Sequence, residues 1–259
     1  MLVITVANQK GGVGKTTTAV TLGHGLARQN YTVLLIDLDP QGHIAFSLGL
    51  EKAPGLHRLL VEQAPVGEVA VRARPGLEII SGNKRTEAVK RYVTTLDFRE
   101  RVLINCLREV NLRYDVVLMD TAPSLDVLHV AALVASDWVL VPTKLDAMAV
   151  DGVNEILRSM GEVAQQDHAF LGYSILPTFF DRTTRETAYQ LRQVVNAFGV
   201  KVWPPIPQDT RAREAAAYGQ TLWEYTPYSP SVTGYESNGK QIGGYADVLQ
   251  RIMEVVNHG

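Results

Sequence analysis

The chain has 259 residues, 46% of them hydrophobic, which is enough for a large folded core. Its formal net charge of −2 excludes nucleic-acid binding through bulk charge, so any such surface has to be local. No apolar run reaches the ~20 residues of a membrane span, and the single cysteine has no internal partner for a disulfide. We therefore expect one cytoplasmic domain over residues 1–259, with no membrane contact.

Apolar runs typical of strands alternate with helical patterns along the chain. The runs are continuous rather than alternating, which indicates a parallel sheet covered on both faces. The order predicts an α/β fold with a doubly wound, mostly parallel sheet and helices on both faces. Strands are expected at 2–7, 32–36, 77–80, 116–119, 138–142, 170–176 and 200–203, helices at 17–29, 84–110, 125–135, 152–166, 185–198 and 244–257, and a surface loop at 224–243.

A glycine-rich segment at 10–17 joins the first expected strand to the first expected helix. Such a turn points several backbone N–H groups at one anion, most often a phosphate. Lys15 can reach the outer phosphates, and the Thr16 hydroxyl can bind Mg²⁺. An ordinary P-loop would have glycine at position 9, where this chain has Gln9. The expected nucleotide contacts are Lys10, Gly11, Gly12, Val13, Gly14, Lys15, Thr16 and Thr17.

Acidic residues follow two further strands. Asp37 and Asp39 come after the strand at 32–36, and alternation sends both side chains to the same side. A carboxylate near a γ-phosphate can orient the attacking water, although two acids here could also cap the next helix. Asp120 ends the strand at 116–119 in the manner of a Walker B motif, which predicts that it holds Mg²⁺ through water.

The pattern Lys-Gly-Gly-x-Gly-Lys-Thr at 10–16 resembles the deviant Walker A ATPases of the ParA/MinD family at every position. The resemblance implies an ATP-sandwich homodimer in which Lys10 crosses to the partner's phosphates. It makes Lys10, Lys15 and Asp39 the catalytic residues, with Asp39 acting on the attacking water and Asp37 supporting Mg²⁺-bound water or Lys15. Mg²⁺ would be held by Thr16 and by waters on Asp39 and Asp120.

The part of the nucleotide site that contacts the adenine base is expected in loops after later strands, as is usual in such sheets. The segments 177–182 and 205–209 resemble the base-contacting segments of that family, and they make Pro207 and Asp209 candidate contacts. Nothing resembles the Asn-Lys-x-Asp guanine motif, so ATP is favoured over GTP.

The cysteine count and the tail sequence distinguish among the members of the ParA/MinD family. One cysteine argues against relatives that carry an iron–sulfur cluster. The tail at 245–259 has one arginine and two acids, so we expect it to pack in the core rather than bind lipid as in MinD. The chain thus resembles ParA-type partition ATPases, which implies nonspecific DNA binding on the nucleoid, a ParB-like activating partner, and a chromosome, plasmid or protein cargo. The alternatives are a MinD-type membrane-surface positioning ATPase and a metabolic enzyme such as an amide-forming ligase.

A local basic excess supports the DNA hypothesis. Residues 181–213 hold six basic groups against three acids, although such runs are usually solvated faces. The Ile-Pro-Arg-x-x-Arg pattern of the family has Gln208 at its first arginine and Arg211 at its second. The predicted DNA contacts are Arg182, Arg185, Arg211 and Arg213.

Overall fold

A seven-stranded sheet forms the centre of the molecule. The computed structural model describes residues 1–166, 168–237 and 239–258. The strand order is β3-β4-β2-β5-β1-β6-β7, and every neighbouring pair is parallel except β3 with β4, which confirms the predicted doubly wound, mostly parallel fold. The strands are β1 (Leu2–Val6), β2 (Val33–Asp37), β3 (Val71–Arg74), β4 (Leu77–Ile80), β5 (Val116–Asp120), β6 (Trp138–Lys144) and β7 (Gly172–Thr178).

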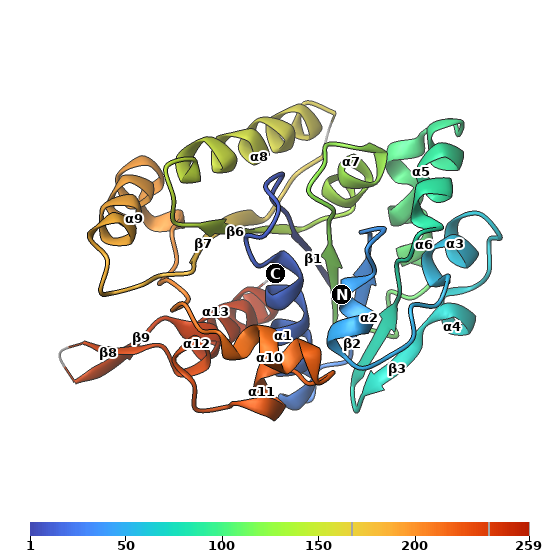
Figure 1. Ribbon diagram of the computed structural model, residues 1–259. Helices are drawn as coiled ribbons and strands as arrows, with labels where there is room; N and C mark the ends of the chain where they lie inside the picture. The colour runs from blue at the N-terminus through green and yellow to red at the C-terminus, as the bar shows by residue number, and fades with distance from the viewer. Residues whose placement is uncertain (167, 238, 259) are drawn as a thin grey trace.

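Helices cover both faces of this sheet (Figure 1). On one face, α1 (Lys15–Arg28) and α13 (Gly244–His258) share a core with alternate residues of the strands, such as Ile4 and Leu35. On the other face, intervening residues such as Leu34 pack against the remaining long helices. Those helices are α5 (Thr86–Thr94), α6 (Val102–Arg108), α7 (Val127–Val134), α8 (Ala149–Ala164) and α9 (Arg185–Phe198).

The terminal helix α13 belongs to the core. Tyr245, Val248, Leu249 and Ile252 are all buried in the cluster that also contains α1. The prediction that this tail packs in the core is therefore confirmed. Among the residues that the structure describes, no helix is both long and apolar enough to cross a bilayer.

Three expectations about local structure were wrong. The helix expected at 84–110 is broken into α5, the short helix η1 (Arg99–Arg101) and α6, with Phe98 at a positive φ of 53° between them. The strand expected at 200–203 is the short helix η2 (Gly199–Lys201) followed by one bridge to β7. The loop expected at 224–243 folds into α11 (Leu222–Tyr225), α12 (Pro230–Thr233) and a hairpin of β8 (Tyr235–Ser237) and β9 (Lys240–Ile242).

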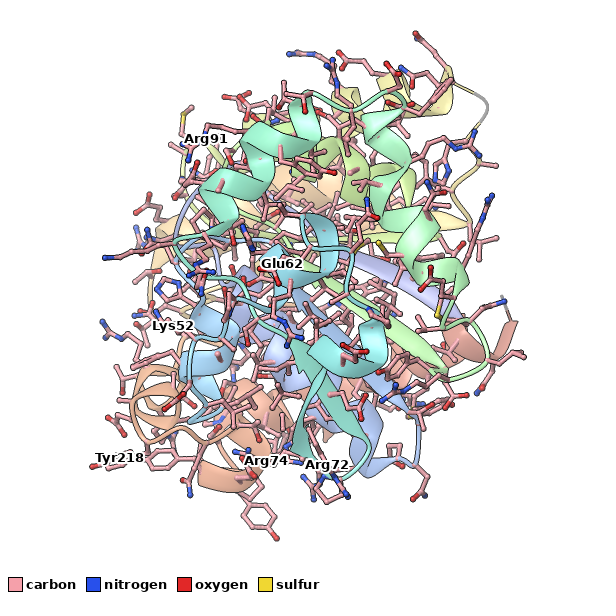
Figure 2. The ribbon with its side chains drawn as sticks, turned by 90° about the vertical axis from the view of Figure 1, so that its right-hand side faces the viewer. Lys52, Glu62, Arg72, Arg74, Arg91 and Tyr218 are labelled. Atoms are coloured by element: carbon pink, nitrogen blue, oxygen red, sulfur yellow. The ribbon has the colours of Figure 1, made fainter. Side chains whose placement is uncertain are left out.

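An ion pair joins the C-terminal third of the chain to the edge of the sheet. Arg74 of β3 pairs with Glu224 of α11 at 2.6 Å and donates to the Gly219 carbonyl at 2.9 Å. Figure 2 shows Arg72 and Arg74 side by side on this edge, with Tyr218 projecting nearby from the C-terminal segment. Further short helices connect the long elements, namely α2 (His43–Ser47), α3 (Gly55–Leu60), α4 (Val66–Val69) and α10 (Arg211–Ala217).

Candidate functional site

The turn between β1 and α1 has the geometry of an anion-binding loop. Gly12 and Gly14 have φ values of 71° and 92°, a region that side chains with a Cβ rarely occupy. A Cβ at Gly11 or Gly12 would meet no atom within 4 Å, and both residues are exposed, so this part of the loop borders open space that a ligand could fill. Lys15 is buried, and its Nζ donates to the Lys10 carbonyl at 3.1 Å. Burial lowers the pKa of Lys15, against the opposing pull of nearby carboxylates.

A hydroxyl and a carboxylate meet beside the loop. Thr16 Oγ1 donates to Asp120 Oδ2 at 2.6 Å, because Asp120 ends β5 next to β1. The other oxygen, Asp120 Oδ1, is buried and has no hydrogen-bond partner within the described residues. Burial raises the pKa of Asp120 to about 7, and the Thr16 hydrogen bond and the Lys15 charge oppose that rise.

These two side chains fit Mg²⁺. A carboxylate oxygen that is desolvated and unpaired is a ligand for a hard cation, and a hydroxyl oxygen beside it is a second. No group of three or more His, Cys, Asp or Glu that could hold a metal occurs among residues 1–166, 168–237 and 239–258. Two protein groups suit Mg²⁺ bound with a nucleotide, since this ion keeps several waters and takes its other ligands from phosphates.

The two acids after β2 have different roles. Asp39 is half-buried, lines the cavity described below, and accepts the Gln41 N–H at 2.8 Å. Asp37 is fully buried and accepts the backbone N–H groups of Asp39 and Ile44, each at 3.0 Å. The expectation that Asp37 supports Mg²⁺-bound water or Lys15 stays a prediction, and in the structure each of its oxygens accepts one N–H of the turn into α2.

The two loop lysines point in different directions. Lys10 Nζ forms an ion pair with Asp146 Oδ2 at 2.5 Å, away from the pocket that Lys15 enters. Asp146 follows β6 and also accepts the Met148 N–H at 3.1 Å, at the start of α8. Partial burial would raise the pKa of Asp146, but the hydrogen bond from Lys10 and the one from Met148 hold it below its usual value.

A cavity of about 630 Å³ opens next to the glycine-rich loop, which is large enough for a nucleotide. Its wall contains Asp39 and Pro123 near the loop and reaches Pro207 and Asp209 at the far side. Phe179 also lines it, at a positive φ of 56°. The structure thus brings most of the predicted phosphate, metal and adenine residues to one cavity, whereas Lys10, Val13 and Asp120 are not among its lining residues.

The far wall contains contributions that the sequence did not reveal. Asp209 accepts a hydrogen bond from Ser231 at 3.0 Å and pairs with Arg211 at 2.9 Å, so its carboxylate is held inside the wall. Tyr245 lines the cavity and its hydroxyl lies 3.0 Å from Thr18 Oγ1. Ser231 and Tyr245 lie in irregular or tail sequence with no motif to mark them.

The four arginines predicted to contact DNA lie in two places. Arg211 pairs with Asp209, and Arg213 lines the nucleotide cavity. Arg182 lies over the Tyr235 ring at 4.8 Å, and Arg185 is exposed at the start of α9. Neither Arg182 nor Arg185 has an ion pair among the described residues. DNA contact by these arginines stays a prediction.

Comparison with known proteins identifies the family. Residues 1–172 match the AAA domain family. The chromosome partitioning protein ParA of Caulobacter vibrioides is 35% identical over 232 residues, which cover 86% of each chain. The chromosome-partitioning ATPase Soj of Thermus thermophilus is 35% identical over 241 residues, covering 92% of this chain and 94% of the relative.

Solved structures agree in fold. A Mycobacterium smegmatis structure described as cobyrinic acid a,c-diamide synthase, with a bound ATP analogue and magnesium, is 34% identical with a TM-score of 0.76 and covers 85% of this chain and 91% of its own. Apo McdA from Cyanothece has a TM-score of 0.80 at 23% identity, covering 88% and 94%, which speaks to fold alone. The loop, the Thr16–Asp120 pair and these relatives lead to one conclusion. The chain belongs to the ParA/Soj family of P-loop ATPases, which hydrolyse ATP with Mg²⁺.

Proposed function

We propose that this chain is a positioning switch that dimerises around two ATP–Mg²⁺ and binds DNA without sequence preference in that state. A ParB-like partner stimulates hydrolysis and so releases the dimer from the nucleoid. Repeated cycles position or segregate a chromosome, a plasmid or a protein cargo. The curated partition relatives support this proposal.

One observation carries the dimer step, namely the outward direction of Lys10. Its ammonium lies at Asp146 while Lys15 occupies the phosphate loop, so Lys10 is available to a nucleotide held by a facing subunit. ATP then favours the dimer because Lys10 gains a phosphate contact only across the interface. Exchange of the Asp146 pair for that contact is the local event of the switch.

The DNA step rests on the exposed pair Arg182 and Arg185 at the start of α9. Two cations that neutralise phosphates release counterions, so affinity falls as salt rises. We would measure binding to an unrelated DNA duplex with ATP, with ADP and without nucleotide, at low and moderate salt. The proposal expects salt-sensitive, sequence-independent binding with ATP only.

A double variant tests the surface itself. R182A/R185A should weaken DNA binding and flatten its salt dependence while ATP binding is unchanged. R91A is the matched control, because Arg91 is an exposed arginine on α5 (Figure 2). No DNA binding in any state would overturn the proposal, and vesicle sedimentation would then test the MinD-type alternative.

The M. smegmatis structure described as a diamide synthase supports a second candidate, an amide-forming ligase. Such an enzyme activates a carboxylate with ATP and forms an amide from it. It predicts that hydrolysis depends on a small carboxylate substrate, whereas a positioning switch predicts stimulation by a protein partner. Assays of ATP turnover with each kind of addition separate the two.

A further inference from the structure

A second hollow lies at the opposite end of the sheet from the nucleotide cavity. Its volume is about 510 Å³, within the range of ligand-binding sites. It is formed where β6 and β7 begin, beside η2 and the last turns of α13. We call it the basal groove and define it by Trp138, Leu171, Tyr173, Lys201, Trp203 and Arg251.

Aromatic walls and two cations give the basal groove its chemistry. Lys201 Nζ lies 5.1 Å from the Tyr173 ring centre, and the Arg251 guanidinium lies 5.9 Å from the Trp203 ring centre. Such stacking keeps the charges beside flat apolar surface. Lys201 has no ion pair within the described part of the chain, whereas Arg251 shares its charge with Asp247 at 3.2 Å. One carboxylate, Glu254, also lines the groove, so with Asp247 the charges balance in number, and Lys201 is the cation that is left for an acidic partner.

Exposed aliphatic side chains extend the basal groove at its rim. Val200 is 95% exposed and Leu171 is 57% exposed, although both adjoin an aromatic hollow. The neighbouring Gly172 is required by the packing, because a Cβ there would lie 2.6 Å from the Trp138 ring. Apolar surface left in water next to a shaped hollow is typical of an interaction site.

We propose that the basal groove binds a short segment of a partner protein in which carboxylates alternate with apolar side chains. The carboxylates meet Lys201 and Arg251, and the apolar side chains meet the aromatic walls. A peptide fits better than a small acid, because an occupant must also cover Val200 and Leu171, which line the hollow but remain exposed at its rim. Because Lys201 has no ion pair among the described residues, its charge favours an acidic segment over a basic one.

The position of the groove gives its partner a distinct role. Along β7, the groove reaches Ser174 and the nucleotide cavity begins at Thr178, a separation of about 13 Å at ~3.3 Å per residue. An occupant therefore neither touches the nucleotide nor blocks the face from which Lys10 projects. Such a site suits an adaptor that stays bound through the ATPase cycle, and it does not depend on DNA as the matrix.

The test uses one labelled peptide, Ac-Glu-Leu-Asp-Phe-Glu-Leu-NH₂ with a terminal fluorophore, titrated with the full chain. We expect saturable binding below about 1 mM, together with a change in tryptophan emission, since Trp138 and Trp203 are two of the three tryptophans. Affinity should be equal with ATP, with ADP and without nucleotide. Matched peptides carry lysine for each acid or serine for each apolar residue, and neither should bind.

Variants assign the binding to the groove. K201E and L171D should each weaken peptide binding by roughly tenfold or more. K201E removes the cation that meets a peptide carboxylate, and L171D removes an apolar contact. K240E and L112D are the controls, since Lys240 and the fully exposed Leu112 lie outside the groove. ATP turnover should stay unchanged in all four. Absence of saturable binding, equal binding of the lysine peptide, or full binding by K201E would each overturn the proposal.

Discussion

The two ends of the sheet hold charge in different ways. At the carboxyl ends of β1, β2 and β5, Lys15, Asp37 and Asp120 are buried and each has defined hydrogen bonds. At the amino ends of β6 and β7, Lys201 and Arg251 lie over aromatic rings near open surface. Buried, oriented charges suit a small ligand of fixed geometry such as a nucleoside triphosphate. Charges that lie over exposed aromatic rings suit a protein partner of variable sequence.

The largest expected effect is the loss of ATP binding at the nucleotide cavity, in a variant that leaves the basal groove unchanged. K15A should weaken ATP binding by about 100-fold, because it removes charge-assisted hydrogen bonds to phosphate. A fluorescent ATP analogue measures this directly. K201A, which removes the same kind of charge from the basal groove, should leave ATP affinity within about twofold. Equal losses in both variants would show that the two ends are not independent.

A buried histidine should make the nucleotide end sensitive to acid. His129 in α7 is 2% exposed, neither ring nitrogen has a hydrogen-bond partner within the described residues, and burial lowers its pKa to about 4. The unfolded chain binds this proton first, below about pH 6.5, so stability is lost as the pH falls from there towards 4. The loss between pH 7 and pH 5 is about 2 kcal/mol.

The variant H129L should remove that loss. Urea unfolding at pH 7 and pH 5 measures it, with H57Q as a control because His57 is a less buried histidine paired with Glu62. A pH dependence that is the same in H129L and the wild type would contradict this assignment.

The next effect separates the two lysines within one loop. K10A should bind ATP normally but dimerise roughly tenfold more weakly or not at all, because the trans phosphate contact is lost. Sedimentation velocity with ATP measures the association. Normal ATP-dependent dimerisation by K10A would refute the trans role of Lys10.

The smallest effect concerns the partner of Lys10. D146N should release Lys10 from its ion pair and strengthen ATP-dependent dimerisation by up to about fivefold, which is the scale of a partly exposed pair. The same sedimentation assay serves, and D151N on α8 is the control for a nearby lost acid. Weaker dimerisation in D146N would mean that Asp146 aligns α8 and the loop rather than restraining Lys10.

Short-range patterns carried the predictions that succeeded. The glycine-rich turn between β1 and α1, the Asp120 strand and the alternation of strands and helices follow from residues adjacent in sequence, so the fold class and the position of that turn were predictable. The strand β3 was missed because its Val-Arg-Ala-Arg sequence is half exposed at an antiparallel edge. The Asp37 contacts and the Lys10–Asp146 pair depend on backbone geometry and on residues 136 positions apart, which no local pattern specifies.

The packing of α13 on α1 has a consequence during synthesis of the protein on the ribosome. The glycine-rich loop is synthesised more than 200 residues before Ser231 and Tyr245, which complete the cavity wall. A nascent chain therefore has the loop long before it has the closed pocket. The nucleotide pocket is complete only after α13 has been made, so in the proposed dimer an unfinished subunit on the ribosome would not pair with finished ones.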